Sequence, residues 1–332
     1  MLTLTIDLER WRSHQDRIAQ DIPGLVPVAK GNGYGFGLPR LAAEAQRLGV
    51  PTIAVGTAAE VSQVRPHFSG SIVVLQPWSP QFNYEIDDDT IVTVARIADL
   101  ADLPDGTRTL VEARTSMKRF GITREEFDQV APHVGHLRFE GWTIHLPMES
   151  SLAEGENLAR FARTAVAAPV WFSHLDRHVH DNLAAEFDVR LRMGTELWLG
   201  EPAALQVEAQ VLDVHPVKRG EKIGYWQRPA PSKGHVLVLS GGTSNGIGMA
   251  APSAAHGMGQ RARAVAAGGL EAVGAALSPY SIAGTKRWFC EPPHMQASMV
   301  FLPAKVDPPE IGSWVPVAVR NTTATFDQII EA

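Results

Sequence analysis

Residues 25–37 read LVPVAKGNGYGFG, a short apolar run that passes directly into a glycine-rich loop. An uninterrupted apolar run is typical of a strand buried on both faces of a sheet. Lys30 follows at the carboxyl end of this run, where α/β folds bind their ligands. The glycines let the backbone approach a ligand closely, and the hydroxyl of Tyr34 suits a phosphate oxygen. A lysine in this setting forms a Schiff base with a carbonyl cofactor when desolvation lowers its pKa. A solvated lysine in a flexible turn is an equally good interpretation of these residues taken alone.

Similar apolar runs recur along the first two-thirds of the chain and alternate with amphipathic stretches. The predicted strands are 25–31, 52–56, 71–76, 90–95, 108–114, 137–146, 169–174 and 188–194. The predicted helices between them include 39–49, 58–64, 124–134 and 152–167. This alternation predicts an α/β fold with an N-terminal (β/α)8 barrel. An open doubly wound sheet is the alternative, but no G-x-G-x-x-G follows the first strand.

After about residue 200 the pattern changes to short strand-like runs separated by turn-rich segments such as KRGEKIG and QRPAPSKG. This spacing favours a mostly β C-terminal domain. We therefore expect a barrel over 1–203 and a β domain over 204–332. The Ala- and Gly-rich segment 249–279 is compatible with a weak helix or a loop.

Composition narrows the class of protein. The 332 residues are 45% hydrophobic and 20% charged, as in globular proteins with a sizeable core. The net charge of -6 argues against nucleic acid as a partner. The single cysteine, Cys290, excludes an internal disulfide framework and fits a reducing compartment. The N-terminus lacks the apolar core of a signal peptide, and no apolar run is long enough to span a membrane, so we expect a cytoplasmic protein without a membrane partner.

The stretch VAKGNGYGFG at 28–37 resembles the pyridoxal-phosphate attachment motif of the alanine racemase family, fold type III. Further motifs resemble the family in chain order. They are LTIDLERWRSH (4–14), VEARTSMKRFGI (111–122), GWTIHLP (141–147), RMGTELWLG (192–200), KRGEKIGYWQRP (218–229), VLVLSGGTSNG (236–246), MQASMVFLP (295–303) and EIGSWVPVAVRNTTATFDQII (310–330). The order of these motifs is more specific than any one of them.

The resemblance implies pyridoxal 5'-phosphate as cofactor and an amino-acid racemase or epimerase that removes the α-proton from an external aldimine. It also implies a head-to-tail homodimer, in which the β domain completes the partner subunit's active site. The implied cofactor-binding residues are Lys30, Tyr34, His145, Arg192, Gly194 and Thr195. The implied substrate-binding residues are Arg119, for the carboxylate, and Met295.

This sequence departs from the family at the second catalytic base. Thr243 stands where the family has a tyrosine, and a threonine hydroxyl is a poor base without an activating partner. His294 is the best candidate for a relocated base because histidine titrates near neutral pH. Other candidates are Tyr225, Tyr280 and Cys290. Further departures are Phe36, Glu112, Gln296 and Phe326 in place of the family's usual residues.

Two alternatives in function stay open. The lost tyrosine also fits a different pyridoxal-phosphate reaction, such as elimination, aldol cleavage or decarboxylation, or a protein that binds the cofactor without catalysis. Cys290 with His294, or the histidines at 174, 178 and 180, have spacings that metal ligands use. A complete metal site needs three or four ligands, so we expect no metal.

Overall fold

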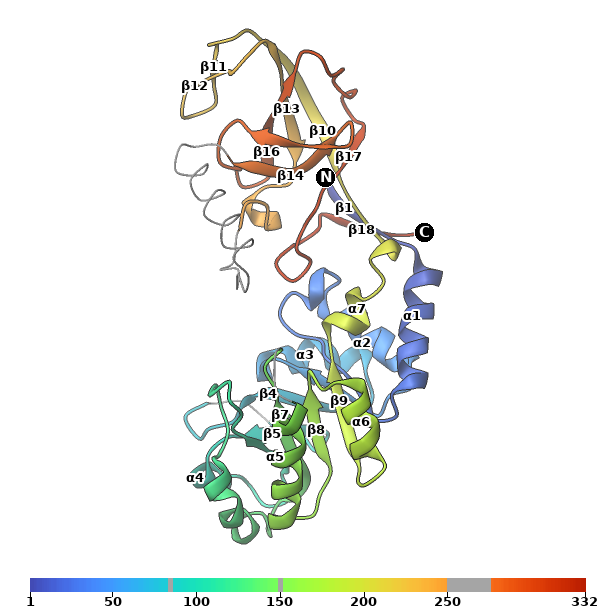
Figure 1. Ribbon diagram of the computed structural model, residues 1–332, viewed down its shortest axis with the longest axis vertical. Coiled ribbons are helices and arrows are strands. Elements are labelled where there is room, and N and C mark those ends of the chain that lie inside the picture. Colours follow the sequence, from blue (N-terminus) through green and yellow to red (C-terminus); the bar gives the residue numbers. More distant parts are fainter. Residues whose placement is uncertain (83–85, 149–151, 250–275) are drawn as a thin grey trace. The chain divides into compact units, whose positions relative to one another are not determined.

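The computed structural model describes residues 1–82, 86–148, 152–249 and 276–332. These residues divide into two compact units, one formed by Arg12–Gly200 and the other by Met1–Trp11 together with Glu201–Ala332. Figure 1 shows the helices and strands of both.

The first unit is the predicted barrel. Within the described residues its strands are β2 (Leu25–Pro27), β3 (Thr52–Val55), β4 (Ser71–Pro77), β5 (Thr90–Val94), β6 (Arg108–Ala113), β7 (Arg138–His145), β8 (Val170–Ser173) and β9 (Val189–Met193). All neighbours are parallel, in the order β2-β9-β8-β7-β6-β5-β4-β3. A parallel bridge between Val28 and Ala54 joins the two edges of the sheet. The sequence-based prediction of a (β/α)8 barrel is therefore confirmed.

The helices of this unit lie between the strands. They are α1 (Leu8–Asp21), α2 (Leu38–Arg47), α3 (Val61–Val64), α4 (Ile97–Leu100), α5 (Leu152–Ala165), α6 (Arg177–Ala184) and α7 (Thr195–Leu199). The helix predicted over 124–134 is wrong in type, because 3-10 turns at Arg124–Gln129 and Ala131–His133 replace it. Pro132 explains the difference, since it has no N–H and its ring would collide with a carbonyl one α-helical turn earlier.

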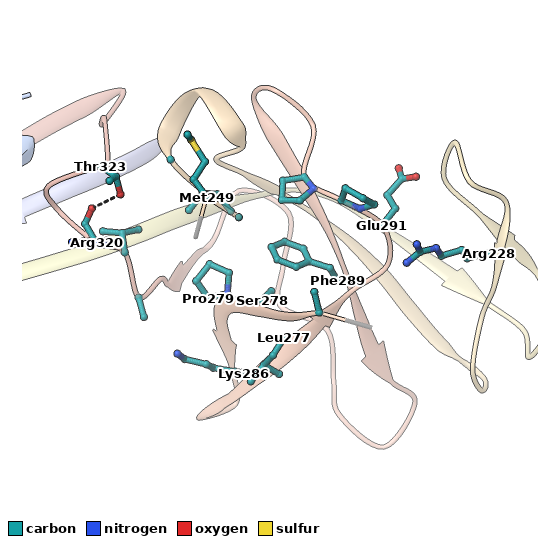
Figure 2. Close-up of a pocket in the computed structure, with 18 residues that line it drawn as sticks. Arg228, Met249, Leu277, Ser278, Pro279, Lys286, Phe289, Glu291, Arg320 and Thr323 are labelled. Carbon is teal, nitrogen blue, oxygen red and sulfur yellow. Dashed lines mark hydrogen bonds between the residues drawn. The ribbon is translucent and has the colours of Figure 1, made fainter. Parts of the chain in front are cut away.

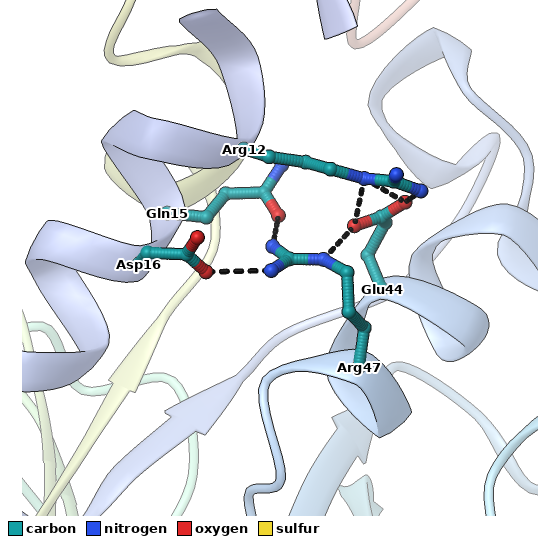
Figure 3. A network of polar contacts seen from close by, with 5 residues as sticks. All are labelled: Arg12, Gln15, Asp16, Glu44 and Arg47. Carbon is teal, nitrogen blue, oxygen red and sulfur yellow. Dashed lines mark hydrogen bonds and ion pairs between the residues drawn. The ribbon is translucent and has the colours of Figure 1, made fainter. Parts of the chain in front are cut away.

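A buried carboxylate fastens α1 to α2 (Figure 3). Glu44 is 4% exposed and accepts hydrogen bonds from Arg12 and Arg47, each at 2.6 Å. Arg47 also donates to Asp16 at 2.6 Å and to Gln15 at 2.9 Å. The carboxylate is desolvated but has a guanidinium on each side, which is the condition under which a buried charge is tolerated.

The second unit is mostly β, as predicted. Its main strands are β1 (Leu2–Ile6), β10 (Leu205–Val217), β13 (Gly234–Ser240), β14 (Leu277–Ile282), β15 (Thr285–Phe289), β16 (Ala297–Pro303), β17 (Trp314–Pro316) and β18 (Gln328–Glu331), with a small hairpin of β11 (Lys222–Ile223) and β12 (Arg228–Pro229). Most of the predicted weak helix or loop at 249–279 lies outside the described residues, and β14 begins at Leu277.

The N-terminus is a correction to the expected domain boundaries. The first eleven residues group with the β unit and not with the barrel. Strand β1 pairs antiparallel with β10 and parallel with β18, and Leu2, Leu4 and Ile6 are fully buried. Residues after 200 therefore supply the hydrogen-bond partners of β1 and group with it in the same unit. No helix in the described ranges is long and apolar enough to cross a membrane.

Candidate active site

Lys30 lies at the mouth of the barrel, three residues after the end of β2. The chain before it is fixed on both sides, because the N–H of Val28 donates to Met193 and the N–H of Ala29 donates to Ala54, each at 2.8 Å. Desolvation lowers the pKa of the Lys30 ammonium, and the cations Arg119 and Arg192 lower it further. Glu60 opposes this shift. A lysine with a lowered pKa supplies more of the neutral amine, which is the nucleophilic form.

The loop after Lys30 packs against the start of α7. Tyr34 is 7% exposed and has a left-handed backbone with φ of 55°. A Cβ placed on Gly194 would lie 2.0 Å from the Tyr34 hydroxyl oxygen, so the hydroxyl rests directly on the Gly194 backbone. The indole of Trp198 donates to the Val28 carbonyl at 2.8 Å and fixes α7 against β2. The hydroxyl of Tyr34 and the first amides of α7, which begins at Thr195, therefore form one polar cradle.

Arg192 on β9 is a buried cation at the same mouth. It donates to the carbonyls of Ile144 at 3.2 Å and Phe172 at 3.4 Å. Desolvation lowers the pKa of this guanidinium to about 10, while Glu112 opposes the shift and Arg119 adds to it. Arg192 therefore stays charged at neutral pH and is a fixed hydrogen-bond donor.

His145, the last residue of β7, is neutral at pH 7. Desolvation and then the nearby cations, Arg192 first, lower its pKa to about 3. Its Nδ1 lies 2.5 Å from the Ser173 hydroxyl oxygen, which orients the ring. His174 packs edge-on against it with the ring centroids 5.4 Å apart, and burial lowers the pKa of His174 as well.

His174 was not expected at this site, because in the sequence it falls in one group with His178 and His180. Its position directly after β8 was the available signal, because strand ends converge at the mouth of a barrel. His180 is instead buried in α6 beside Asp181, with 3.0 Å between His180 Nδ1 and Asp181 Oδ1.

Arg119 and Glu112 belong to the β6 side of the mouth. The chain after β6 makes an excursion and returns at Ile122, whose N–H donates to the Glu112 carbonyl at 2.9 Å. Arg119 lies on this excursion, is exposed, and shifts the pKa values of Lys30, His145, Arg192 and Glu112. Burial raises the pKa of Glu112, and Arg192 and Arg119 oppose this. Arg119 is therefore an exposed cation that acts on the lysine, and a guanidinium is suited to an anionic group.

The β unit carries a second group of the predicted residues. The N–H of Thr243 donates to the His294 carbonyl at 2.8 Å, and the N–H of Ser244 donates to the Met295 carbonyl at 3.0 Å. Thr243 and Met295 are exposed. His294 Nε2 lies 2.6 Å from Oε1 of Glu291, a buried carboxylate that the sequence analysis missed because nothing local marks it as buried.

Two candidates for the relocated base do not fit that role. Tyr280 is fully buried, its hydroxyl is hydrogen-bonded to the Gly241 carbonyl at 2.8 Å, and burial raises its pKa to about 12. Cys290 is buried in a small apolar cluster, and desolvation raises the pKa of its thiol to about 12. Phe326 packs against the core of the β unit. Within the described ranges no three or more His, Cys, Asp or Glu residues gather as metal ligands would.

A cavity of about 600 Å³ lies in the β unit beside Glu291 (Figure 2). Its lining is largely apolar, with Met249, Leu277 and Phe289 among the contributors, and the cations Arg228, Lys286 and Arg320 lie around it. No sequence motif predicted this cavity.

Comparisons with known proteins identify the relatives of this chain. The family profile described as the N-terminal domain of alanine racemase matches residues 6–175. The alanine racemase of Corynebacterium efficiens is 25% identical over 286 residues, which are 76% of this chain and 77% of that protein. The alanine racemase of Geobacter sulfurreducens is 27% identical over 281 residues, 73% of each chain. The crystal structure of alanine racemase from Bartonella henselae with covalently bound pyridoxal phosphate gives a TM-score of 0.74 at 16% identity, covering 100% of this chain and 99% of that one. At that identity the structural likeness establishes the fold alone.

Proposed function

Because the chain belongs to the alanine racemase family, we propose that it is a pyridoxal-phosphate-dependent amino-acid racemase or epimerase. The observation that carries the proposal is the cradle beside Lys30, where the Tyr34 hydroxyl rests on Gly194 at the start of α7. A side chain at position 194 would fill this cradle, whereas glycine leaves it open. The residues present therefore fit a phosphate group next to a reactive lysine. When bound there, pyridoxal phosphate withdraws electrons from the α-carbon of an amino acid and acidifies its proton.

Each barrel residue then has a defined task. Lys30 holds the cofactor and moves a proton on one face of the substrate α-carbon. Tyr34, Gly194 and Thr195 hold the phosphate. Arg192 would face the pyridine nitrogen of the bound cofactor, and a fixed cation there would leave that nitrogen unprotonated and disfavour transamination as a side reaction.

Two further side chains orient the reactants. His145 would pack near the ring of the bound cofactor as a neutral imidazole, and its lowered pKa supports this role. Arg119 binds the substrate carboxylate, a task that suits a planar guanidinium. The exposed position of Arg119 beside Lys30 supports this assignment.

Racemisation needs a second proton carrier on the opposite face. We assign this role to His294 of the partner subunit, because the threonine hydroxyl that Thr243 places at the family's tyrosine position is a poor base. The hydrogen bond between Thr243 N–H and the His294 carbonyl supports the choice, since it keeps the two residues adjacent. Met295 is assigned to the substrate. The protein would then act as a homodimer in which each site uses both chains.

The test is solvent-deuterium incorporation at the α-carbon, started separately from D- and L-amino acids, together with borohydride reduction and peptide mapping. We expect the cofactor on Lys30 and exchange from both enantiomers. Loss of exchange from one enantiomer in His294→Gln would support the assigned base. The replaced tyrosine also supports a second candidate, an elimination, aldol cleavage or decarboxylation. Exchange from a single enantiomer with accumulation of a keto acid, aldehyde or amine would establish that candidate and overturn the racemase.

A further inference from the structure

A buried carboxylate, Glu291, stands behind His294 and has no role in the function proposed above. It is 2% exposed. Its Oε2 accepts from the N–H of Tyr225 at 2.7 Å, and its Oε1 lies 2.6 Å from His294 Nε2. A Cβ on Gly224, which has φ of 67°, would lie 2.2 Å from Oε2, so glycine at that position makes room for the carboxylate. The site is therefore built closely around Glu291.

The backbone that carries the His294 ring is fixed on both sides. Pro292 and Pro293 separate it from Glu291 and fix two consecutive φ angles. The His294 N–H donates to Ala297 at 2.9 Å, and its carbonyl accepts from Thr243. The ring of Tyr225 packs against the imidazole with the centroids 5.1 Å apart. The imidazole thus has little freedom to turn away from the carboxylate.

We propose that Glu291 is a positioning residue that holds His294 in the Nε2–H tautomer and leaves Nδ1 as its proton-accepting atom. This inference rests on the proposed function only where it gives Nδ1 a part in the reaction; the tautomer itself is argued from the contacts of Glu291. The Glu291 carboxylate accepts from the Tyr225 N–H through Oε2 and presents Oε1 to His294 as a second acceptor, so the hydrogen between the two groups is assigned to Nε2. A neutral imidazole with hydrogen on Nε2 carries its lone pair on Nδ1. The same carboxylate stabilises the imidazolium that forms when Nδ1 takes up a proton.

The Tyr225 amide makes Glu291→Gln a sharp test. That N–H can only donate, so the glutamine must turn its carbonyl oxygen toward Tyr225. The NH2 group of the glutamine then faces His294 Nε2. Because an amide NH2 group only donates, Nε2 must accept this hydrogen bond and cannot carry the hydrogen. We therefore expect the substitution to move the His294 hydrogen from Nε2 to Nδ1 while the fold is retained.

The measurement is the long-range ¹⁵N–¹H spectrum of the holoenzyme labelled in histidine, with the His294 signals assigned by their loss in His294→Gln. The expected result is the Nε2–H tautomer in the wild type and the Nδ1–H tautomer in Glu291→Gln. Glu221→Gln is the matched control, since Glu221 is an exposed carboxylate that accepts from the Lys218 N–H at 2.9 Å; it should keep the wild-type spectrum.

A wild-type Nδ1–H tautomer would overturn the positioning role, even if Glu291→Gln does not fold. An unchanged tautomer in a folded Glu291→Gln would overturn it as well. Isotope exchange decides the proposed function separately: Glu291→Gln should slow exchange from one enantiomer by about 10²-fold or more, because Nδ1 no longer accepts. A moved tautomer with unchanged exchange would uphold the role of Glu291 and remove His294 from the chemistry.

Discussion

Replacing Gly194 by alanine tests the cradle with the addition of one methyl group. The new Cβ would lie 2.0 Å from the Tyr34 hydroxyl oxygen and 2.7 Å from Cζ, whereas ordinary contacts begin at 3.4 Å. The hydroxyl must therefore retreat by about 1.4 Å, the difference between 3.4 and 2.0 Å. Tyr34 is buried and its backbone is left-handed, so the ring has little room to retreat. Overpacking of this kind costs about 1–3 kcal/mol.

If that cost falls on the phosphate site, the affinity for pyridoxal phosphate drops by about 5- to 150-fold. The assay is titration of the apoprotein with the cofactor, followed by visible absorbance, beside a urea unfolding curve. Gly135→Ala is the control, because a Cβ there meets nothing within 4 Å. Gly194→Ala combined with Tyr34→Phe should recover part of any lost stability, since the atom at 2.0 Å is removed. Wild-type affinity in Gly194→Ala would refute the assignment of the cradle.

Three further predictions concern other parts of the molecule. Glu44→Gln should lower the free energy of unfolding by about 1–3 kcal/mol, since it removes the charge shared by two arginines, whereas the exposed Asp16→Asn should change it by about 0.5 kcal/mol or less; equal losses in urea titrations would contradict the buried network. The unfolded chain protonates His145 below about pH 6.5 and the folded chain does so only near 3, so stability should fall as the pH drops through this window. Over this pH range the loss of unfolding free energy should be about 2 kcal/mol smaller in His145→Gln than in the wild type; the effect is no larger because the ring is only half-buried. Parallel profiles of unfolding free energy against pH for the two proteins would refute this prediction. Lys30→Ala and His294→Ala should each lose racemase activity. If each site uses both chains of a dimer, a refolded equal mixture should regain about a quarter of wild-type activity, because about half of the dimers are mixed and each mixed dimer has one intact site. No recovery would exclude shared sites.

The barrel could be read from the sequence because parallel strands buried on both faces are continuous apolar runs. In a parallel barrel the carboxyl ends of all strands lie at the same end, which also explains why Lys30, His145 and Arg192 meet at one mouth. The placement of β1 could not be read, since LTLTI looks like any other buried strand and its parallel partner lies at residues 328–331. Glu291 was missed for a related reason: only tertiary burial distinguishes it from a surface carboxylate. Pro132, by contrast, can be read from the sequence and disfavours a regular α-helix over 124–134.

The separation of β1 from its partners bears on how the protein is made. Residues 12–200 are contiguous, so every strand of the barrel unit has left the ribosome before most of the β unit exists. Strand β1 is translated before the barrel strands, yet its hydrogen bonds are completed by β10 and by β18. During synthesis this apolar segment therefore waits with unpaired edges, and such edges recruit other strands. A chain cut short before β18 would keep one edge of β1 open permanently. We expect premature termination near residue 327 to leave a well-formed barrel attached to an aggregating sheet.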